Sequence, residues 1–381
     1  MSFDIDKFSE LYRNMYPEAD FSTSYTFYYD ETNNIKKFEV LPQGFNNPFY
    51  NNFVLGGVVF EGEKPDVTDL RQGLRLQSNV NEFKLKHIAK GSFIDCLKSK
   101  KLNYFLRYIF NSPLYVHHSS VNVLYFSIVD IVDSAISNNN NLIRLGREFV
   151  NQLKSDLYDI CKSKIDEIAA IFYEFEYPNV AEEKIPFFND KIIRLITKHV
   201  KDNYHKLEKE YENQWLNMLV EILEESARMY SMPFIVNDKS HVLLDDFFQF
   251  YMRPLYVFVN SVHVFDKEAD IEKKLSGYTL MKNGAPFTNY RFINSCDDIL
   301  IQISDVLIGL RGKLATFINT HSFDEIEDII NGLAPQSFDT LKVYVDLMNK
   351  SLIKNPGFIH YSDSFTELQK INLIHFLRGH S

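Results

Sequence analysis

Two kinds of hydrophobic periodicity divide the chain. In the first part, residues 24–29, 36–41 and 53–61 have the aromatic and β-branched content of β-strands, and turn-forming Asn, Pro and Gly separate these runs. This order predicts a three-stranded meander. Residues 66–107 then favour helices, and residues 114–125, rich in Val, Tyr and His, predict a further strand.

The middle of the chain is helical. A helix is predicted from Tyr125 onward, an Asn-rich stretch at 137–141 breaks it, and residues 142–230 keep a helical period with charged outer faces. Strand character returns at 255–259 and continues through 264–266. The pattern therefore predicts that the chain returns to its sheet after a large helical insertion.

The last third of the chain opens with a loop and then becomes helical. Residues 277–289 contain Gly284-Ala285-Pro286, which predicts a hairpin tip or a mobile loop. Residues 295–314 have the pattern of a helix that is apolar almost all round, and the chain from Ser322 onward is again helical.

One face of the helix predicted at 295–314 is polar. Asp298, Gln302 and Asp305 recur every three or four residues, and Gly309 continues the same face. Two carboxylates on a helix wrapped in apolar residues are costly to bury unless a cation or hydrogen-bond donors compensate them. The pattern therefore predicts an acidic metal-binding site.

Two further acidic elements are candidates for the same site. Asp30 and Glu31 end the first predicted strand, and Glu82 precedes a helical stretch. Each candidate also has a plainer interpretation. Asp298 stands in a pattern close to a capping box, Asp305 is explained by a hydrogen bond to a strand backbone, and Asp30 by a turn.

These motifs, in this order, resemble the bacterial DUF 3800 family, which is related to ribonuclease H. The resemblance spans about residues 25–312 and rests on short pieces of sequence: Tyr29-Asp30-Glu31, Gly56-Gly57, Glu82-x-Lys84, Asn294-Ser295 and Ile301-Gln302-Ile303-Ser304-Asp305-Val306-x-x-Gly309. It implies an α/β fold, a ribonuclease H-like mixed sheet flanked by helices, with a large α-helical insertion. Where the family often has Asp before the Ser, this chain has Asn294, so Asn294, Asp297 and Asp298 remain candidates for one ligand position.

The resemblance and the periodicities together imply four segments. Residues 1–140 form the first part of the ribonuclease H-like core, and residues 141–240 form the α-helical insertion. Residues 241–320 form the second part of the core with the acidic helix, and residues 321–381 form C-terminal helices.

The function implied by the resemblance is that of a metal-dependent nuclease, a hydrolase of phosphodiester bonds in DNA or RNA. The expected metal ligands and catalytic residues are Asp30, Glu82, Asp298 and Asp305, with Asp30 bridging two Mg²⁺ or Mn²⁺ ions. Hard divalent cations prefer oxygen ligands, and carboxylates at close range raise one another's pKa until a cation binds. A role in phage defence or as a toxin is implied by the resemblance alone.

Candidates for substrate binding come from two places. Lys84 and Lys86 begin a lysine-rich stretch that is expected to contact phosphates. His118, next to His117 on a predicted strand, is a candidate for positioning water or transferring a proton. Solvated lysines and a hydrogen-bonded core histidine are the plainer interpretations.

Two alternatives remain open. Glu82-x-Lys84 with Asp30 also fits the metal-binding pattern of restriction-endonuclease-like nucleases, which needs Lys84 but not Asp305. The other alternative is a non-catalytic, degenerate nuclease fold whose helical insertion binds a protein partner. Asn294, in place of an acid, favours this second alternative.

Composition limits these hypotheses. The 381 residues are 45% hydrophobic and 15% aromatic, which is enough for a large core. A net charge of −10 argues against a protein that coats nucleic acid through its overall field, so contact with nucleic acid must be local. Three scattered cysteines do not suggest a disulfide framework. The chain shows no secretory signal and no membrane-spanning pattern, which predicts a cytoplasmic protein without membrane contact.

Overall fold

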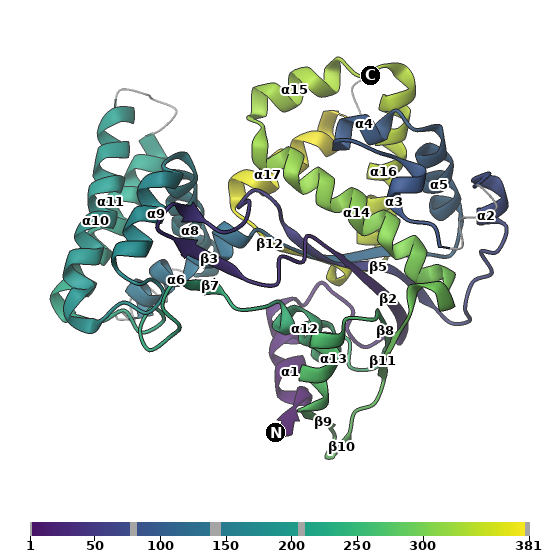
Figure 1. Cartoon of the computed structure of the whole chain (residues 1–381), viewed down its shortest axis with the longest axis horizontal. Coiled ribbons are helices and arrows are strands. Elements are labelled where there is room, and N and C mark those ends of the chain that lie inside the picture. The colour runs from purple at the N-terminus through teal and green to yellow at the C-terminus, as the bar shows by residue number, and fades with distance from the viewer. Residues whose placement is uncertain (1, 77–81, 138–145, 205–209, 378–381) are drawn as a thin grey trace.

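The computed structural model describes residues 2–76, 82–137, 146–204 and 210–377. Helices flank one large mixed sheet, so the predicted α/β class with a mixed sheet is confirmed (Figure 1). Residues 138–141 of the Asn-rich stretch, predicted to break the helix, lie outside the described residues.

The large sheet has six strands. Their order across the sheet is β11 (Tyr290–Ile293), β8 (Val262–Asp266), β2 (Tyr25–Thr32), β5 (Phe53–Glu61), β6 (Tyr115–Val121) and β12 (Ile359–Ser362). β5 is antiparallel to both β2 and β6. β8 is parallel to β2, β11 is parallel to β8, and β12 is parallel to β6. The strand with Asp30 therefore lies in the interior of the sheet.

The predicted meander is wrong in its middle member. β3 (Phe38–Leu41) forms where a strand was expected, but it pairs with β4 (Gly44–Phe45) and β7 (Val242–Leu244) in a separate sheet. β5 takes the place beside β2. Strand character is a local property, whereas the choice of partner depends on which face each strand can bury.

Two elements differ from the predicted type. Residues 255–259 were predicted to be a strand, but α12 (Phe248–Val257) covers most of them. A short apolar run without polar alternation does not distinguish a buried helix from a buried strand, and α12 is apolar on most sides. β12 lies in the C-terminal segment for which only helices were expected.

Helices cover both faces of the sheet (Figure 1). One face carries α14 (Ile299–Thr320), α16 (Pro335–Lys354) and α5 (Lys100–Asn111), and α12 lies on the other. Tyr28 belongs to the apolar cluster under α14, while its neighbour Tyr29 belongs to the opposite cluster. This alternation is the β-period of a strand that is buried on both faces.

Shorter elements complete the described core. They are α1 (Ile5–Met15), α2 (Leu70–Gly73), α3 (Leu85–Ile88), α4 (Phe93–Leu97), α13 (Ala269–Ser276), α15 (Phe323–Asn331), α17 (Phe365–Leu377), η3 (Ser295–Asp297) and η4 (Pro356–Phe358). A small sheet of β1 (Ser2–Asp4), β9 (Thr279–Lys282) and β10 (Ala285–Pro286) contains the predicted hairpin.

α14 lies unusually close to the sheet because β5 has a glycine beneath it. A Cβ atom on Gly57 would lie only 2.1 Å from Oγ of Ser304. The Ser304 hydroxyl oxygen accepts a hydrogen bond from the Val58 amide at 3.2 Å, and the hydroxyl donates to the carbonyl of Leu300 at 2.8 Å. This contact fixes the position of α14, and with it Asp305, over β2 and β5.

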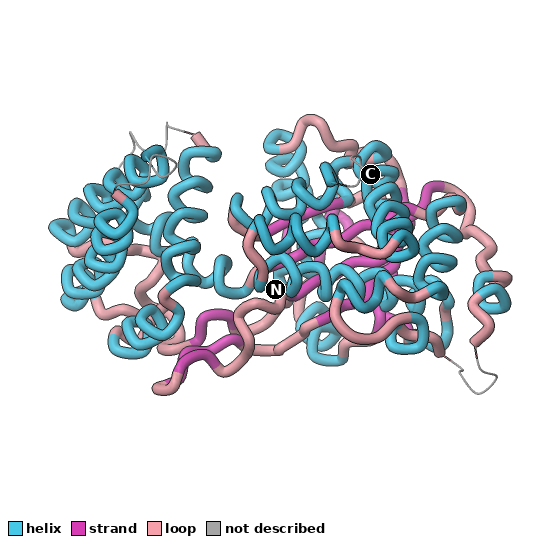
Figure 2. The backbone as a smooth tube through the Cα atoms, turned by 90° about the horizontal axis from the view of Figure 1, so that it is seen from above, coloured by secondary structure: helices cyan, strands magenta, loops and turns pink. Residues whose placement is uncertain are grey.

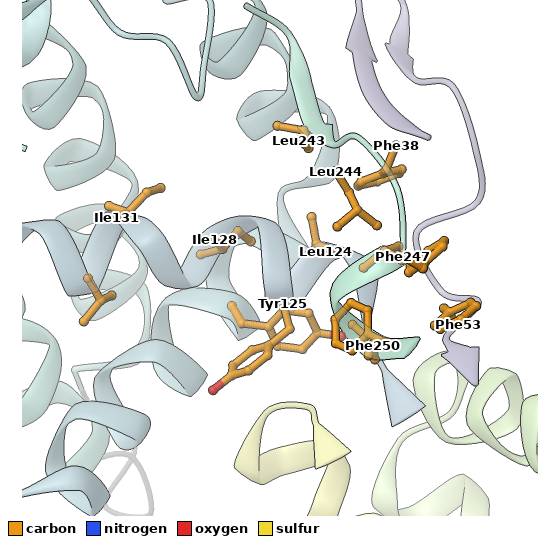
Figure 3. Packing of buried hydrophobic residues seen from close by; sticks show 14 of the residues in the cluster. Phe38, Phe53, Leu124, Tyr125, Ile128, Ile131, Leu243, Leu244, Phe247 and Phe250 are labelled. Atoms are coloured by element: carbon orange, nitrogen blue, oxygen red, sulfur yellow. The ribbon is translucent and has the colours of Figure 1, made fainter. Parts of the chain in front are cut away.

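The middle of the chain forms a helical lobe at one end of the sheet (Figure 2). It contains α8 (Arg147–Ser163), α9 (Ile165–Glu174), η1 (Glu182–Lys184), α10 (Ile185–Asn203) and α11 (Glu210–Met229). α6 (Val123–Ser137) connects this lobe to the sheet through a continuous apolar cluster (Figure 3). In that cluster, the rings of Phe53 and Phe247 stack with centroids 3.8 Å apart. No helix among the described residues is both long and apolar enough to span a membrane.

Candidate functional site

Asp30 and Asp305 come together at the end of β2. Asp30 is 8% exposed, and its carboxylate accepts a hydrogen bond from the Glu31 amide at 2.7 Å. Burial, together with the nearby carboxyls of Asp305, Glu31 and Asp266, raises the pKa of Asp30 to about 8. The fold thus brings together the two acids that the sequence singled out on separate elements.

Asp305 and Gln302 both hold the segment that contains Glu82. The Leu85 amide donates to Oδ1 of Asp305 at 2.8 Å, and the Phe83 amide donates to Oε1 of Gln302 at 3.1 Å. Burial raises the pKa of Asp305, while the Leu85 hydrogen bond and the charge of Lys84 oppose that rise. The polar face of α14 therefore anchors one wall of the site as well as presenting a carboxylate.

Lys84 supplies the positive charge within this acidic cluster. Its ammonium lies 3.2 Å from Oε1 of Glu82 and interacts electrostatically with Asp305 and Asp30. Although burial raises the pKa of Glu82, hydrogen bonds from Ser295 and Lys84 outweigh it and keep that pKa below its ordinary value. Glu82 is therefore ionised and paired, whereas Asp30 remains without enough compensation.

Asp266 joins the cluster from the neighbouring strand. Tyr29 pairs with Phe265 in the parallel β2–β8 register, so Asp30 and Asp266 follow at the same end of two neighbouring strands. Burial raises the pKa of Asp266, and the charges of Lys84 and Glu82 act on it in opposite directions. The sequence signal for this residue is an acid that closes a predicted strand, whereas the pairing of that strand with β2 is seen only in the structure.

Asp298 has a different environment from Asp305. It caps α14, with Oδ1 accepting from the Leu300 amide at 3.0 Å. Its Oδ2 accepts from the Lys64 ammonium at 2.7 Å and from the Tyr28 hydroxyl at 3.0 Å. The structure thus places Asp298 in the helix-capping position of its plainer interpretation.

The other candidates for that ligand position pair with each other. Nδ2 of Asn294 donates to Oδ2 of Asp297 at 3.1 Å, and Asp297 is exposed. Neither residue is among the groups that act on the pKa of Asp30.

The two predicted histidines are in the core. His117 is buried with Nε2 2.9 Å from the carbonyl of Tyr28, and burial lowers its pKa to about 3. His118 is 3% exposed, and its Nε2 accepts a hydrogen bond from Nε of Arg311 at 3.3 Å. The structure therefore places His118 beside Arg311 in the interior of the protein.

A cleft of about 690 Å³ lies beside the acidic cluster. Its lining includes the predicted Lys84 and Lys86, together with Asp305 and Glu31. It also includes Lys90 of the predicted lysine-rich stretch, and two titratable residues that were not predicted from the sequence, Lys313 and His321. Lys313 follows Asp305 at a multiple of the helical spacing, so the periodicity that identified the acidic face contains a signal for it.

The residues around Asp30 fit a divalent cation in their chemistry. They are carboxylates with too little positive charge among them, which is the donor set that Mg²⁺ and Mn²⁺ prefer. Within the ranges that the structure describes, no three His, Cys, Asp or Glu side chains are grouped closely enough to hold an ion. Binding would therefore require side-chain movement, with Lys84 as the group to be displaced.

Comparisons with known proteins do not assign a family or a function to this site. The chain matches no family model, no curated protein and no solved structure. The function must therefore be inferred from the site itself.

Proposed function

We propose that the chain is a divalent-metal-dependent nuclease with a ribonuclease H-like core, as its resemblance to the DUF 3800 family implies. The observation that carries this proposal is that buried Asp30 interacts electrostatically with Asp305, which itself lines a cleft with four lysines. Strand order supports the fold assignment. β2, β5 and β6 form an antiparallel meander, and β8 and β11 add in parallel on the other side of β2, which is the arrangement of a ribonuclease H-like sheet.

The proposed roles follow from the contacts. Asp30 and Asp305 bind Mg²⁺ or Mn²⁺, and Glu82 becomes a further ligand when Lys84 releases it. The bound ions would activate water and neutralise charge on the leaving oxygen of a phosphodiester. Lys84 and Lys86 bind the phosphate backbone at the edge of the cleft. Asp298 is assigned to capping α14 rather than to the metal.

A nuclease assay tests this proposal directly. Labelled single-stranded and duplex DNA and RNA are incubated with Mn²⁺ or Mg²⁺ and with the native chain, Asp30→Asn or Asp305→Asn. We expect cleavage by the native chain and a loss of about 10²-fold or more in each variant, the size expected when an electrostatic contribution to the transition state is removed. Asp202→Asn, an exposed acid on α10, is the matched control and should cleave normally.

The same assay separates the two nuclease hypotheses. Loss of cleavage in Lys84→Met with normal cleavage in Asp305→Asn would favour the restriction-endonuclease-like mechanism. Loss in Asp305→Asn would favour the ribonuclease H-like one.

A second candidate function is a non-catalytic module that binds a protein partner through the helical lobe. The ion pair between Glu82 and Lys84 favours it, because the lysine already occupies part of the acidic cluster. Absence of Mn²⁺ binding by calorimetry, together with absence of cleavage on every substrate, would establish this candidate over the nuclease.

A further inference from the structure

The cleft beside Asp305 follows one helix. Its lining includes Asp305, Gly309, Gly312, Thr316 and Thr320 of α14. These positions recur every three or four residues, so they form one stripe along the helix, about 22 Å long at 1.5 Å per residue. α14 therefore forms the floor of an elongated trough with the acidic cluster at one end.

One wall of the trough is held to this floor by hydrogen bonds. The wall is formed by residues 84–93, and the Leu85 amide donates to Asp305 at 2.8 Å. Further along, the ammonium of Lys313 donates to the carbonyl of Gly91.

The opposite wall is held in the same way. It is formed by residues 31–33 and Asn51. The Thr316 hydroxyl donates to Oδ1 of Asn51 at 2.8 Å, and Nδ2 of Asn33 donates to the carbonyl of Asn52 at 2.9 Å. Hydrogen bonds on both sides mean that the trough exists before any ligand binds.

The trough is basic although the protein is acidic. Four lysines line it, namely Lys84, Lys86, Lys90 and Lys313, against the carboxyl groups of Glu31 and Asp305, in a chain of net charge −10. Other basic residues of the same stretch are neutralised, as Lys98 is by Asp95 and Arg107 by Asp339. Lys84 is paired with Glu82, whereas Lys86, Lys90 and Lys313 form no ion pair within the described ranges. Unpaired positive charge is therefore concentrated where a polyanion would lie.

The side chains that line the trough provide positive charge but few aromatic rings on which bases could stack. The two phenylalanines of this lining, Phe93 and Phe317, are 1% and 5% exposed, and the ring of His321 packs against Phe317 with centroids 4.6 Å apart. Buried rings do not stack on the bases of a bound strand, whereas lysines bind phosphates of any sequence. Recognition in this trough would therefore depend on the backbone of the ligand and not on its bases.

We propose that this trough binds one strand of a polynucleotide through its phosphates and excludes an intact duplex. Walls on both sides of a helical floor can enclose a single backbone, whereas recognition of a duplex usually inserts a protein element into a groove about 12 Å wide. A length of 22 Å accommodates about six nucleotides at 3.4 Å per nucleotide. The inference rests on the proposed function, since a phosphodiester at the end of this track would lie beside Asp305.

Binding without metal tests the proposal independently of cleavage. Fluorescence anisotropy in EDTA compares labelled 12-nucleotide single strands of DNA and RNA with the corresponding duplexes. We expect single strands to bind at least tenfold more tightly than duplexes, with less than a threefold difference between homopolymer and mixed sequences. The DNA and RNA arms identify which backbone the trough prefers.

Lysine variants locate the binding site. Lys86 and Lys90 are exposed, so Lys86→Gln with Lys90→Gln should leave the fold intact, as checked by thermal denaturation. We expect about tenfold weaker binding and a salt dependence reduced by about one to two ions. Lys100→Gln, an exposed lysine on α5 outside this lining, is the control and should bind normally.

The possible outcomes are distinguishable. Equal or tighter binding of duplex, or unchanged binding in the double lysine variant, would overturn the inference about the trough. Single-strand binding that depends on these lysines, without cleavage under any metal, would retain the inference and remove the nuclease proposal. Cleavage that does not depend on these lysines would retain the nuclease proposal and remove the inference about the trough.

Discussion

The same residue type serves two purposes on α14, and the surroundings decide which. Asp298 is matched by donors from Leu300, Lys64 and Tyr28, so its charge is compensated within the fold. Asp305 is buried near the carboxyl of Asp30 and accepts a hydrogen bond from one backbone amide. Because this donor does not offset the effect of burial, the pKa of Asp305 remains raised. A compensated carboxylate stabilises structure, whereas an uncompensated one favours a proton or a cation.

This difference predicts the effect of removing Asp298. Asp298→Ala should lower the free energy of unfolding by about 1 kcal/mol, because the first turn of α14 loses its cap. Nuclease activity should remain within about twofold, since the side chain contacts Lys64 and Tyr28 instead of the cluster. Urea unfolding and the cleavage assay measure the two effects. Asp298→Asn keeps the capping oxygen and should recover most of the stability; a loss of Mn²⁺ binding as severe as in Asp305→Asn would contradict this role.

At the scale of elements, α14 determines how the site is built. It lies across the sheet, anchors the segment before α3 through Gln302 and Asp305, and forms the floor of the cleft. Its close approach depends on small residues at its contacts, on the strand at Gly57 and on the helix at Gly312.

Two glycines of α14 should respond differently to substitution. A Cβ at Gly312 would lie 2.6 Å from Cγ2 of Thr32, whose branched side chain has few alternative rotamers. A Cβ at Gly309 would lie 3.0 Å from Cδ2 of Leu85, which is the end of a longer and more adjustable side chain. Crowding in a packed contact costs about 1–3 kcal/mol, and Ala in place of Gly favours a helix by about 1 kcal/mol.

We therefore expect Gly309→Ala to be nearly neutral and Gly312→Ala to destabilise the protein by about 1–2 kcal/mol. Thermal denaturation of the two variants side by side measures the difference. Equal stability of both variants would show that the end of β2 yields easily and that α14 is not held tightly against it.

At the scale of the whole molecule, the sheet contains neutral histidines that respond to acid. His117, His118 and His263 are each less than 5% exposed. Burial lowers the pKa of all three, to about 3 for His117 and about 4 for His263. Each is neutral in the folded protein and binds a proton when the chain unfolds below about pH 6.5.

The sign of the pH effect follows from these values. Below about pH 6.5 the histidine of the unfolded chain binds a proton, whereas the folded histidine with its lowered pKa does not. The free energy of unfolding therefore holds its full value above about pH 6.5 and decreases as the pH falls toward the pKa of the folded histidine. For His263 this window lies between about pH 6.5 and 4. His263→Gln should therefore reduce the slope of unfolding free energy against pH by about 1.4 kcal/mol per pH unit. Urea unfolding from pH 6.5 to 4.5 measures it, and an unchanged slope would show that His263 is not neutral in the fold.

The sequence by itself determined what depends on neighbouring residues along the chain. Aromatic and β-branched content predicted β2, β5 and β6, and the helical period predicted α14 and placed Asp305 on its polar face. Asp30, at the end of a predicted strand, and Glu82, before a predicted helix, were candidates from the sequence, and the resemblance implied their role as metal ligands. These signals are local, because side-chain direction along a strand or helix is fixed by the backbone repeat.

Only the tertiary structure decided what depends on contacts between distant segments. It removed β3 from the main sheet, added β12 to it, and made a helix of residues that were predicted to be a strand. It separated the capping Asp298 from Asp305, moved His118 into the core, and gathered Lys90 and Lys313 at one cleft. Burial, charge compensation and strand pairing arise from packing between elements far apart in sequence, so no local pattern contains them.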